Sequence, residues 1–322
     1  MPLETIAVIG AGAWGTALAQ AAAMAGRAVT LVGRDAAAVA EINERHRNSQ
    51  HLGDIALHPS IRARTDLPPT DFVLLAVPAQ QSRAVLTRYH AELAGKPVVL
   101  TAKGLETGTL RRQSEILFEC VPTARPYVLS GPSFAADVAQ GRPTAVTLAG
   151  DDAEETEAIA AALAGPALRP YAAGDRLGVE LAGALKNVYA LACGAVDGAG
   201  LGASTRAALI ARAFAEMTRL VVAMGGQATT LTGLAGLGDL TLSCTSTQSR
   251  NYRYGAALGA NRSTETIGLA EGVMTAPVAL ALANELRIEA PLIGAVNLLL
   301  SGTTTIADIV AGLMARPLKR ET

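Results

Sequence analysis

The sequence predicts an α/β domain built on a parallel sheet, followed by an all-helical domain. Three observations predict this fold class. A short apolar run near the start leads through a glycine-rich loop into an alanine-rich helix. Strand-like and helical patterns then alternate up to about residue 148, as in sheets covered by helices. From about Asp175 onward, apolar residues recur at helical spacing instead. We therefore expect one domain over 1–176 and a second over 177–322.

The first predicted element is a strand over Thr5 to Ile9, an apolar run of the kind that lies inside a sheet. The motif Gly10-Ala-Gly-Ala-Trp-Gly15 follows directly, and a helix over Thr16 to Ala25 follows the motif. Strand, glycine loop and helix in this order are typical of a Rossmann-like dinucleotide-binding domain.

Each glycine of this loop has an expected task. Gly10 makes the tight turn, Gly12 lets the backbone approach a pyrophosphate, and Gly15 lets the helix pack closely against the sheet. The free amides at the start of the helix would face the pyrophosphate. Trp14 either covers part of the cofactor or caps the local core.

The second predicted strand, Ala28 to Val32, should end at the residue that contacts the adenosine ribose, where NAD enzymes usually carry Asp or Glu. This chain has Gly33-Arg34-Asp35 there. A guanidinium suits a 2′-phosphate, so Arg34 favours NADP, while Asp35 keeps NAD open. Alternatively, Arg34 is a surface arginine without a ligand.

Four further strands complete the predicted sheet, with a helix over 80–93 among them. Two motifs follow such strands: Thr101-Ala-Lys103-Gly104 and Ser130-Gly131-Pro-Ser133-Phe-Ala135. Ligands of parallel sheets bind at the carboxyl ends of the strands. These loops are therefore expected to bind a small anionic substrate. The four strands are expected over 71–77, 98–101, 126–129 and 145–148.

The segment from Val179 to Gly194 reads as one buried helix in which Lys186 and Asn187 are the only strongly polar residues between Leu181 and Ala192. Burial disfavours an ammonium ion and lowers the pKa of a lysine. Lys186 is therefore a candidate acid/base. The alternative is a lysine whose stem packs on apolar neighbours while its head reaches water.

The helical half contains two further polar motifs. Asp239 follows Gly236-Leu-Gly238, and Ser249-Arg250-Asn251 combines a guanidinium with short polar groups, which is a common way to hold a phosphate. Asp239 would orient Lys186, or else it is a turn residue or helix cap. Arg250 is a phosphate ligand or a solvated charge. Helix breaks are expected at Ala276-Pro277 and Ala290-Pro291.

Composition excludes several classes. The net charge of −1 provides no basic excess for nucleic acid, and the three cysteines lack paired spacing, which suits a reducing cytoplasm. The four histidines lack ligand spacing, so no metal site is expected. No apolar run suits a signal peptide or an uninterrupted membrane span.

With these motifs in order, the sequence resembles the soluble, bacterial NAD(P)-dependent glycerol-3-phosphate dehydrogenases from Ile6 to about Ile293. The resemblance implies NAD(P)H-dependent reduction of dihydroxyacetone phosphate, with NADPH favoured by Arg34, in a cytoplasmic homodimer that supplies phospholipid synthesis. The sequence departs from the family at Ala13, often serine, at His51, often tyrosine, and at Leu269, usually valine.

The resemblance also implies roles for individual residues. Lys186 falls on the family's proton donor, with Lys103 and Asp239 beside it as catalytic residues. The substrate positions are Lys103, Gly131, Ser133, Lys186, Asp239, Ser249, Arg250 and Asn251. The cofactor positions are Gly10, Gly12, Ala13, Trp14, Gly15, Arg34, Lys103, Ala135, Arg250, Leu269 and Glu271.

Two other functions remain open from the sequence. A related two-domain hydroxy-acid dehydrogenase would share the glycine loop and a catalytic lysine. A non-catalytic NAD(P)-sensing protein would share only the dinucleotide site, and it would need neither Lys186 nor the Arg250-Asn251 pair.

Overall fold

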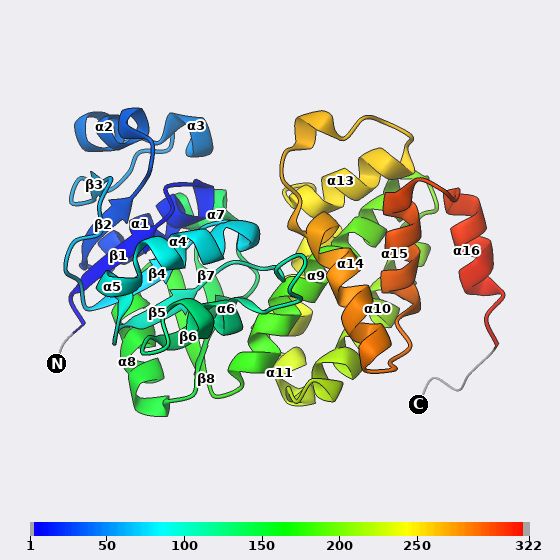
Figure 1. Cartoon of the computed structure of the whole chain (residues 1–322). Coiled ribbons are helices and arrows are strands. Elements are labelled where there is room, and N and C mark those ends of the chain that lie inside the picture. The colour runs from blue at the N-terminus through cyan, green and yellow to red at the C-terminus, as the bar shows by residue number, and fades with distance from the viewer. Residues whose placement is uncertain (1–2, 318–322) are drawn as a thin grey trace.

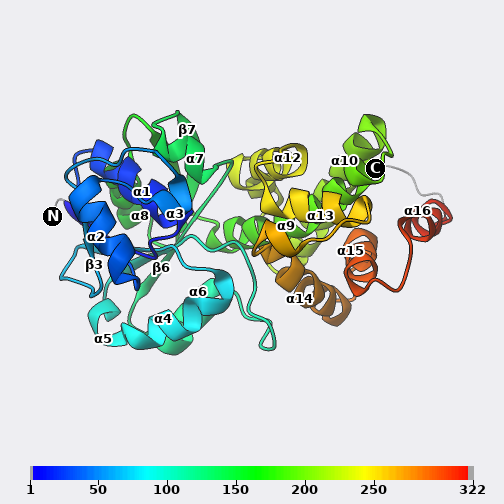
Figure 2. The same cartoon turned by 90° about the horizontal axis from the view of Figure 1, so that it is seen from above.

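The computed structural model describes residues 3–317, in which a sheet half and a helical half lie side by side (Figure 1). All described strands belong to the sheet half, and from Arg176 onward the described chain is helical or irregular. Figure 2 shows the same two bodies from above, with α9 (Arg176–Gly198) running from their junction into the helical half. The prediction of a sheet domain followed by a helical domain is confirmed.

The sheet has eight strands in the order β3-β2-β1-β4-β5-β6-β7-β8. All neighbouring strands are parallel except β6 and β7, which pair antiparallel, so the prediction of a wholly parallel sheet is wrong at this point. The connection between them contains only the five-residue α7 (Ala135–Ala139). A helix of roughly 8 Å cannot run back along a six-residue strand of roughly 20 Å, and the chain therefore returns directly.

The central strands are runs of mainly apolar residues, whose side chains are buried on both faces of the sheet. The predicted bounds of β1 and β2 agree with the structure to the residue, because both strands are apolar runs bounded by polar or glycine positions. Two edge strands, β3 and β8, were not predicted, since their sequences Arg-Ala-Arg and Leu-Arg-Pro-Tyr-Ala-Ala carry arginine or proline and half-exposed side chains. The strands are β1 (Thr5–Ile9), β2 (Ala28–Val32), β3 (Arg62–Arg64), β4 (Phe72–Leu75), β5 (Pro97–Leu100), β6 (Arg125–Ser130), β7 (Thr144–Gly150) and β8 (Leu168–Ala173).

The helices of the sheet half cover both faces of the sheet. The single helix expected over 80–93 is divided into three pieces that break at Gln81 and Tyr89. These helices are α1 (Ala13–Met24), α2 (Ala36–Arg45), α3 (Ser49–Leu52), η1 (Ala79–Gln81), α4 (Ser82–Arg88), α5 (His90–Leu93), α6 (Gln113–Cys120) and α8 (Ala153–Leu163), together with α7.

In the helical half, the predicted break at Ala290-Pro291 is confirmed and the break at Ala276-Pro277 is wrong. Pro277 lies inside α14 on its exposed side, where water can satisfy the carbonyl that lost its donor. Besides α9, these helices are α10 (Ala203–Ala223), α11 (Ala228–Leu231), η2 (Leu234–Gly238), α12 (Asp239–Thr245), α13 (Arg250–Gly259), η3 (Glu265–Ile267), α14 (Glu271–Glu285), α15 (Pro291–Ser301) and α16 (Ile306–Met314).

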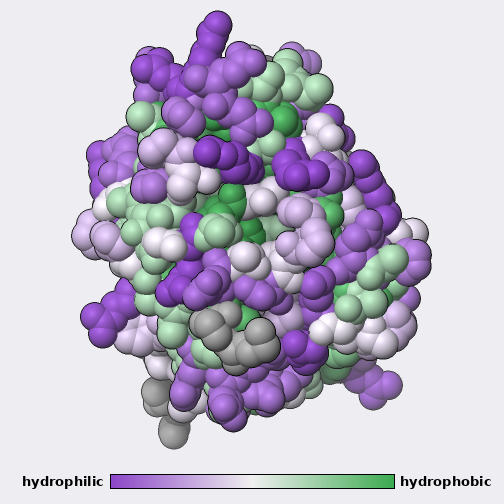
Figure 3. Space-filling model, turned by 90° about the vertical axis from the view of Figure 1, so that its left-hand side faces the viewer, coloured by the Kyte–Doolittle hydropathy of each residue, from purple (hydrophilic) through white to green (hydrophobic). Residues whose placement is uncertain are grey.

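Separate apolar cores hold the two halves. One cluster under α1 and another under α4 and α6 cover the two faces of the sheet, and a third surrounds α9 in the helical half. The outer face of the sheet half is mostly hydrophilic, with smaller apolar areas between polar ones (Figure 3). Packing against the sheet and against helices on all sides makes α9 the centre of the molecule.

The α9 helix combines length with apolar composition. Among the described residues it is the only helix long and apolar enough to cross a membrane by these two measures. Its most apolar 18-residue window is entirely buried inside the fold, which is what the core helix of a folded domain shows.

Candidate active site

Two lysines from different halves of the molecule share one buried carboxylate. The Nζ atom of Lys186 lies 2.8 Å from Oδ1 of Asp239, and Nζ of Lys103 lies 2.6 Å from Oδ2 of the same residue. Asp239 is 1% exposed and Lys186 is 7% exposed. Most of the Lys186 side chain is therefore buried and its ammonium group binds a carboxylate, which favours the acid/base interpretation of this lysine.

Burial and charge act against each other in this group. Burial lowers the pKa of Lys103, the Asp239 carboxylate opposes this effect, and Lys186 adds to the lowering, so that the pKa of Lys103 is about 8. Burial raises the pKa of Asp239, but the two ammonium groups outweigh burial and hold it below its ordinary value. Asp239 is therefore a carboxylate at neutral pH.

Elements from both halves position these side chains. Lys103 follows β5 at the carboxyl edge of the sheet, Lys186 lies in the middle of α9, and Asp239 is the first residue of α12. The carbonyl of Gly131, just after β6, accepts a hydrogen bond from Lys103 at 3.0 Å. Gly131 has a φ of +147°, a conformation that favours glycine.

Two asparagines connect the lysines to the remaining helices. The Nδ2 atom of Asn187 donates to the carbonyl of Lys103 at 2.7 Å. Asn251 donates to Oδ1 of Asn187 at 2.9 Å and accepts from the amide of Gly272 at 2.9 Å. Asn251 is thus engaged with protein groups on both ends of its amide, and it holds Asn187 in place beside Lys186.

Arg250 and Ser249 lie at the start of α13. The Ser249 hydroxyl caps this helix by accepting from the amide of Tyr252 at 3.3 Å. Arg250, the first residue of the helix, is exposed, and its side chain makes no hydrogen bond or ion pair with residues 3–317. Its guanidinium is therefore available to an anion, next to amides at a helix start.

The other predicted substrate and cofactor residues come from the loop after β6 and from the start of α14 in the helical half. Ser133 donates to the Gly131 carbonyl at 3.0 Å, and Ala135 is the first residue of α7. Glu271 starts α14 and accepts from the amide of Ala79 at 3.0 Å, which ties the helical half to the end of β4. Leu269 is 46% exposed just before it.

The glycine loop has the space that a dinucleotide requires. A Cβ at Gly10 would lie 2.5 Å from the carbonyl oxygen of Ala76, and one at Gly15 would lie 1.9 Å from that of Gly10, whereas a Cβ at Gly12 would meet nothing within 4 Å. The first turn of α1, which begins at Ala13, contains no acidic residue. Open space above free amides fits a pyrophosphate.

The residues expected around the adenosine and nicotinamide are placed as follows. Arg34 is exposed after β2. Asp35 is used as a helix cap, since its carboxylate accepts from the amide of Ala37 at 2.9 Å. Trp14 packs on the core beneath α1, and its buried Nε1 has no partner among the described residues.

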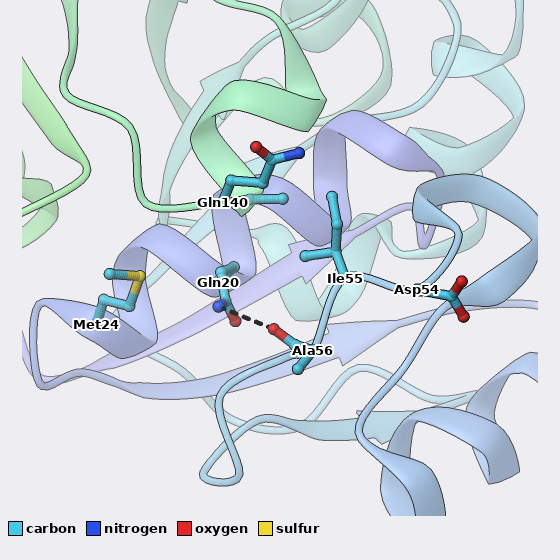
Figure 4. Close-up of a pocket in the computed structure, with 7 residues that line it drawn as sticks. Gln20, Met24, Asp54, Ile55, Ala56 and Gln140 are labelled. Carbon is cyan, nitrogen blue, oxygen red and sulfur yellow. Dashed lines mark hydrogen bonds between the residues drawn. The ribbon is translucent and has the colours of Figure 1, made fainter.

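A pocket elsewhere on the sheet half contains none of the predicted site residues. It lies beside α1 and is lined by Gln20, Met24, Asp54, Ile55, Ala56, Ala139 and Gln140 (Figure 4). The lining mixes apolar groups with amides and the Asp54 carboxylate and contains no lysine or arginine, so it does not suit a phosphorylated substrate.

The comparisons with known proteins agree with this geometry. Residues 5–156 match the N-terminal part and residues 175–311 the C-terminal part of the family described as NAD-dependent glycerol-3-phosphate dehydrogenase. The chain belongs to this family. It is 49% identical over 331 residues to the NAD(P)+ glycerol-3-phosphate dehydrogenase of Caulobacter vibrioides, with all of both chains covered.

Other glycerol-3-phosphate dehydrogenases are also similar to this chain. The enzyme of Brucella canis is 50% identical over 321 residues, with 98% of each chain covered. The crystal structure of the glycerol-3-phosphate dehydrogenase of Coxiella burnetii has a TM-score of 0.91 and 36% identity, and the match covers 98% of this chain and 100% of that one. The predicted family, fold class and NAD(P)-dependent oxidoreductase class are confirmed.

One residue in contact with Lys186 was missed in the sequence. The hydroxyl of Ser243 lies 2.6 Å from Nζ of Lys186 and is 1% exposed. Ser243 stands four positions after Asp239, and helical spacing from a predicted site residue was the signal that would have found it.

Proposed function

We propose that this glycerol-3-phosphate dehydrogenase reduces dihydroxyacetone phosphate to sn-glycerol 3-phosphate, reversibly, with Lys186 as the proton donor and acceptor. The observation that carries the proposal is the pair of lysine ammonium groups on one buried carboxylate, at the edge of the sheet that also holds the glycine loop. Such a group supplies a proton and positive charge in a place with little water.

Ketone reduction defines what the protein must provide. When bound, NAD(P)H supplies the hydride that reduces the carbonyl carbon. Lys186 stabilises the oxygen as it becomes an alkoxide and gives it a proton, and Lys103 adds a second positive charge. Asp239 holds both lysines in position through its two oxygens, and Ser243 fixes Nζ of Lys186 from a further side.

The substrate phosphate is proposed to bind at the start of α13. The exposed guanidinium of Arg250 and the helix amides provide charge and direction. The Ser249 hydroxyl and Asn251 complete the expected set, although the hydrogen bonds of Asn251 indicate that it acts mainly by holding Asn187. Binding the phosphate fixes the carbonyl relative to Lys186 and reduces the entropy lost in the reaction.

The cofactor is proposed to lie along the glycine loop, with NADPH preferred over NADH. Gly10, Gly12, Ala13, Trp14 and Gly15 form the loop and the helix start, and Arg34 would meet the 2′-phosphate. Because Asp35 caps α2, its carboxylate is less available to a ribose hydroxyl. The preference for NADPH over NADH is expected to fall at least tenfold in Arg34→Ala. A preference equal to that of the wild-type protein would contradict this role of Arg34.

The deciding experiment follows NADPH and NADH absorbance with dihydroxyacetone phosphate. Wild-type protein should turn over, and Arg250→Ala should raise the KM for this substrate at least tenfold while cofactor affinity stays within about threefold. Turnover of a carboxylate substrate alone would favour a hydroxy-acid dehydrogenase. Binding of NADPH without any turnover would favour a sensing protein.

The setting of the enzyme is also part of the proposal. We expect domains over 1–176 and 177–322, which is supported by the end of the strands at Ala173 and the start of α9 at Arg176. We further expect a cytoplasmic homodimer whose product supplies glycerophospholipid synthesis. A mass measurement in solution by light scattering tests the dimer.

A further inference from the structure

A buried side chain outside the glycine loop makes a hydrogen bond to the backbone of the loop. Asn48 is 0% exposed. Its Nδ2 donates to the carbonyl of Ala11, inside the loop, at 2.9 Å and to the hydroxyl of Thr16 in α1 at 2.8 Å. Because a carbonyl only accepts, the nitrogen end of the amide must face Ala11.

The contact with Ala11 orients the next amide. In a planar trans peptide, the carbonyl of Ala11 and the N–H of Gly12 belong to one unit and point in opposite directions. A donor that holds the carbonyl on the protein side therefore turns the Gly12 N–H outward. That side is open, because a Cβ at Gly12 would meet nothing within 4 Å, and it is where a pyrophosphate would approach.

The position of Asn48 in the chain supports this role. Asn48 directly precedes α3, where asparagine commonly caps a helix with its side chain, yet this side chain makes no cap bond. Its Oδ1 is buried without a partner among the described residues. A buried acceptor without a partner is unfavourable. An apolar side chain would therefore suit position 48 better if the Nδ2 donor of Asn48 had no role.

The segment that carries Asn48 is fixed against α1. The side chain of Gln20 in α1 accepts from the amide of His58 at 2.6 Å. It also donates to the carbonyl of Ala56 at 3.4 Å (Figure 4). At the other end of the segment, the carbonyl of His46 accepts from Leu57. Asn48 therefore reaches the loop from a segment that is itself anchored.

We infer that Asn48 is a positioning residue for cofactor binding, which aims the Gly12 amide at the pyrophosphate. The inference rests on the proposed use of NAD(P)H. It predicts a specific loss of affinity for ligands that contain a pyrophosphate, and unchanged handling of the ketose phosphate, which binds on the other side of the site.

The test compares four variants of the full chain. Asn48→Asp keeps the shape but replaces the donor by an acceptor, and Asn48→Ala removes it. Thr16→Ala removes only the partner outside the loop. Asn297→Ala is the matched control, because Asn297 also donates twice from Nδ2, to Ala276 and Ile293 in the helical half. Circular dichroism and thermal unfolding establish that each variant is folded.

Titrations use NADPH, ADP and AMP, followed by kinetics with dihydroxyacetone phosphate. Both Asn48 variants should bind NADPH and ADP about 10- to 100-fold more weakly. AMP affinity should change less than about threefold, and the KM for dihydroxyacetone phosphate and kcat at saturating NADPH less than about twofold. Thr16→Ala and Asn297→Ala should keep NADPH affinity within about threefold.

Three results would overturn the inference. The first is wild-type affinity for NADPH and ADP in both folded Asn48 variants. The second is a loss of NADPH affinity in Asn297→Ala equal to that in the Asn48 variants. The third is failure of both Asn48 variants to fold, which would indicate a purely structural role. Failure of the proposed function is distinguishable. Wild-type protein would then bind NADPH without turnover of dihydroxyacetone phosphate, and the ADP titration would still decide the role of Asn48.

Discussion

At the scale of single residues, the site depends on the contact of Lys186 with Asp239 and Ser243. We predict that Lys186→Ala lowers kcat on the order of 10²- to 10⁴-fold, because the nascent alkoxide loses its proton source. Affinity for NADPH should stay within about threefold. Steady-state kinetics and a fluorescence titration measure both quantities.

The control for this variant is Lys96→Ala. Lys96 donates to the carbonyl of Thr70 at 2.6 Å and has no part in the site, so its loss should leave kcat within about twofold. Near-normal turnover by Lys186→Ala would remove Lys186 from the mechanism.

The lowered pKa of Lys103 gives a pH dependence. With a pKa of about 8, Lys103 is charged below that pH and becomes neutral as the pH rises through it. If its charge helps reduction, kcat/KM should fall above about pH 8. Lys103→Arg keeps its charge far above that pH, so the fall should move to higher pH even if the activity is lower. Superimposable profiles up to about pH 10 would contradict this role.

How far these residues were predictable depends on their sequence distance. Lys186 was found because a lone lysine in an apolar helix is conspicuous. Lys103 and Asp239 were indicated by their loop motifs, and the resemblance then gave them places in the site. That both lysines share one carboxylate was not predictable from spacing, since Lys103 and Asp239 lie 136 positions apart and meet only through tertiary packing. Ser243 lies four positions after Asp239 in the same helix, so helical spacing would have indicated it, but it was not predicted.

At the scale of elements, α9 and α13 touch through glycines. A Cβ at Gly194 would lie 2.0 Å from the carbonyl oxygen of Tyr252, and one at Gly255 would lie 1.9 Å from that of Leu191. The two backbones are therefore in contact, and this contact sets the position of Arg250 and Asn251 relative to Lys186.

We predict that Gly255→Ala destabilises the protein by about 1–3 kcal/mol, because the extra methyl group pushes two helix backbones apart. The KM for dihydroxyacetone phosphate should rise in the same variant, since Asn251 moves with α13. Urea unfolding and steady-state kinetics measure these effects.

Gly294→Ala in α15 is the matched control. A Cβ at Gly294 would meet nothing within 4 Å, so this change should stabilise the protein by about 0.4–1 kcal/mol. Equal stability of the two variants would show that α9 and α13 can move apart without lowering the free energy of unfolding.

Prediction of the elements themselves followed burial. The strands β1 and β2 were found to the residue, because a charged residue and a glycine bound each mainly apolar run, whereas the bounds expected for the fully buried β4 and β5 differ from the structure by one or two residues. The edge strands β3 and β8 were missed, since their exposed residues carry no such pattern. The antiparallel pairing of β7 depends on the short α7, and Pro277 inside α14 is tolerated on an exposed side, so neither could be predicted from local pattern alone.

At the scale of the whole molecule, buried polar contacts join the two halves around α9. Besides Lys103 with Asp239, a buried contact joins Glu180 with Ser114. Glu180 of α9 is 6% exposed. Its carboxylate accepts hydrogen bonds from the amide of Ser114 at 2.8 Å and from the hydroxyl of Ser114 at 2.7 Å, in the first turn of α6. Burial raises the pKa of Glu180 above its ordinary value, against the effect of these hydrogen bonds.

We predict that Glu180→Ala lowers the free energy of unfolding by about 2–4 kcal/mol, because it leaves the Ser114 donors buried without a partner. Glu180→Gln keeps an acceptor and should lose less. The exposed Glu157→Ala should change stability by less than about 0.5 kcal/mol. Urea unfolding at neutral pH measures all three.

Since Glu180 also fixes the start of the helix that carries Lys186, kcat should fall in Glu180→Ala more than in Glu180→Gln. Equal stability of the Glu180→Ala and Glu157→Ala variants would show that the halves are held together without this contact.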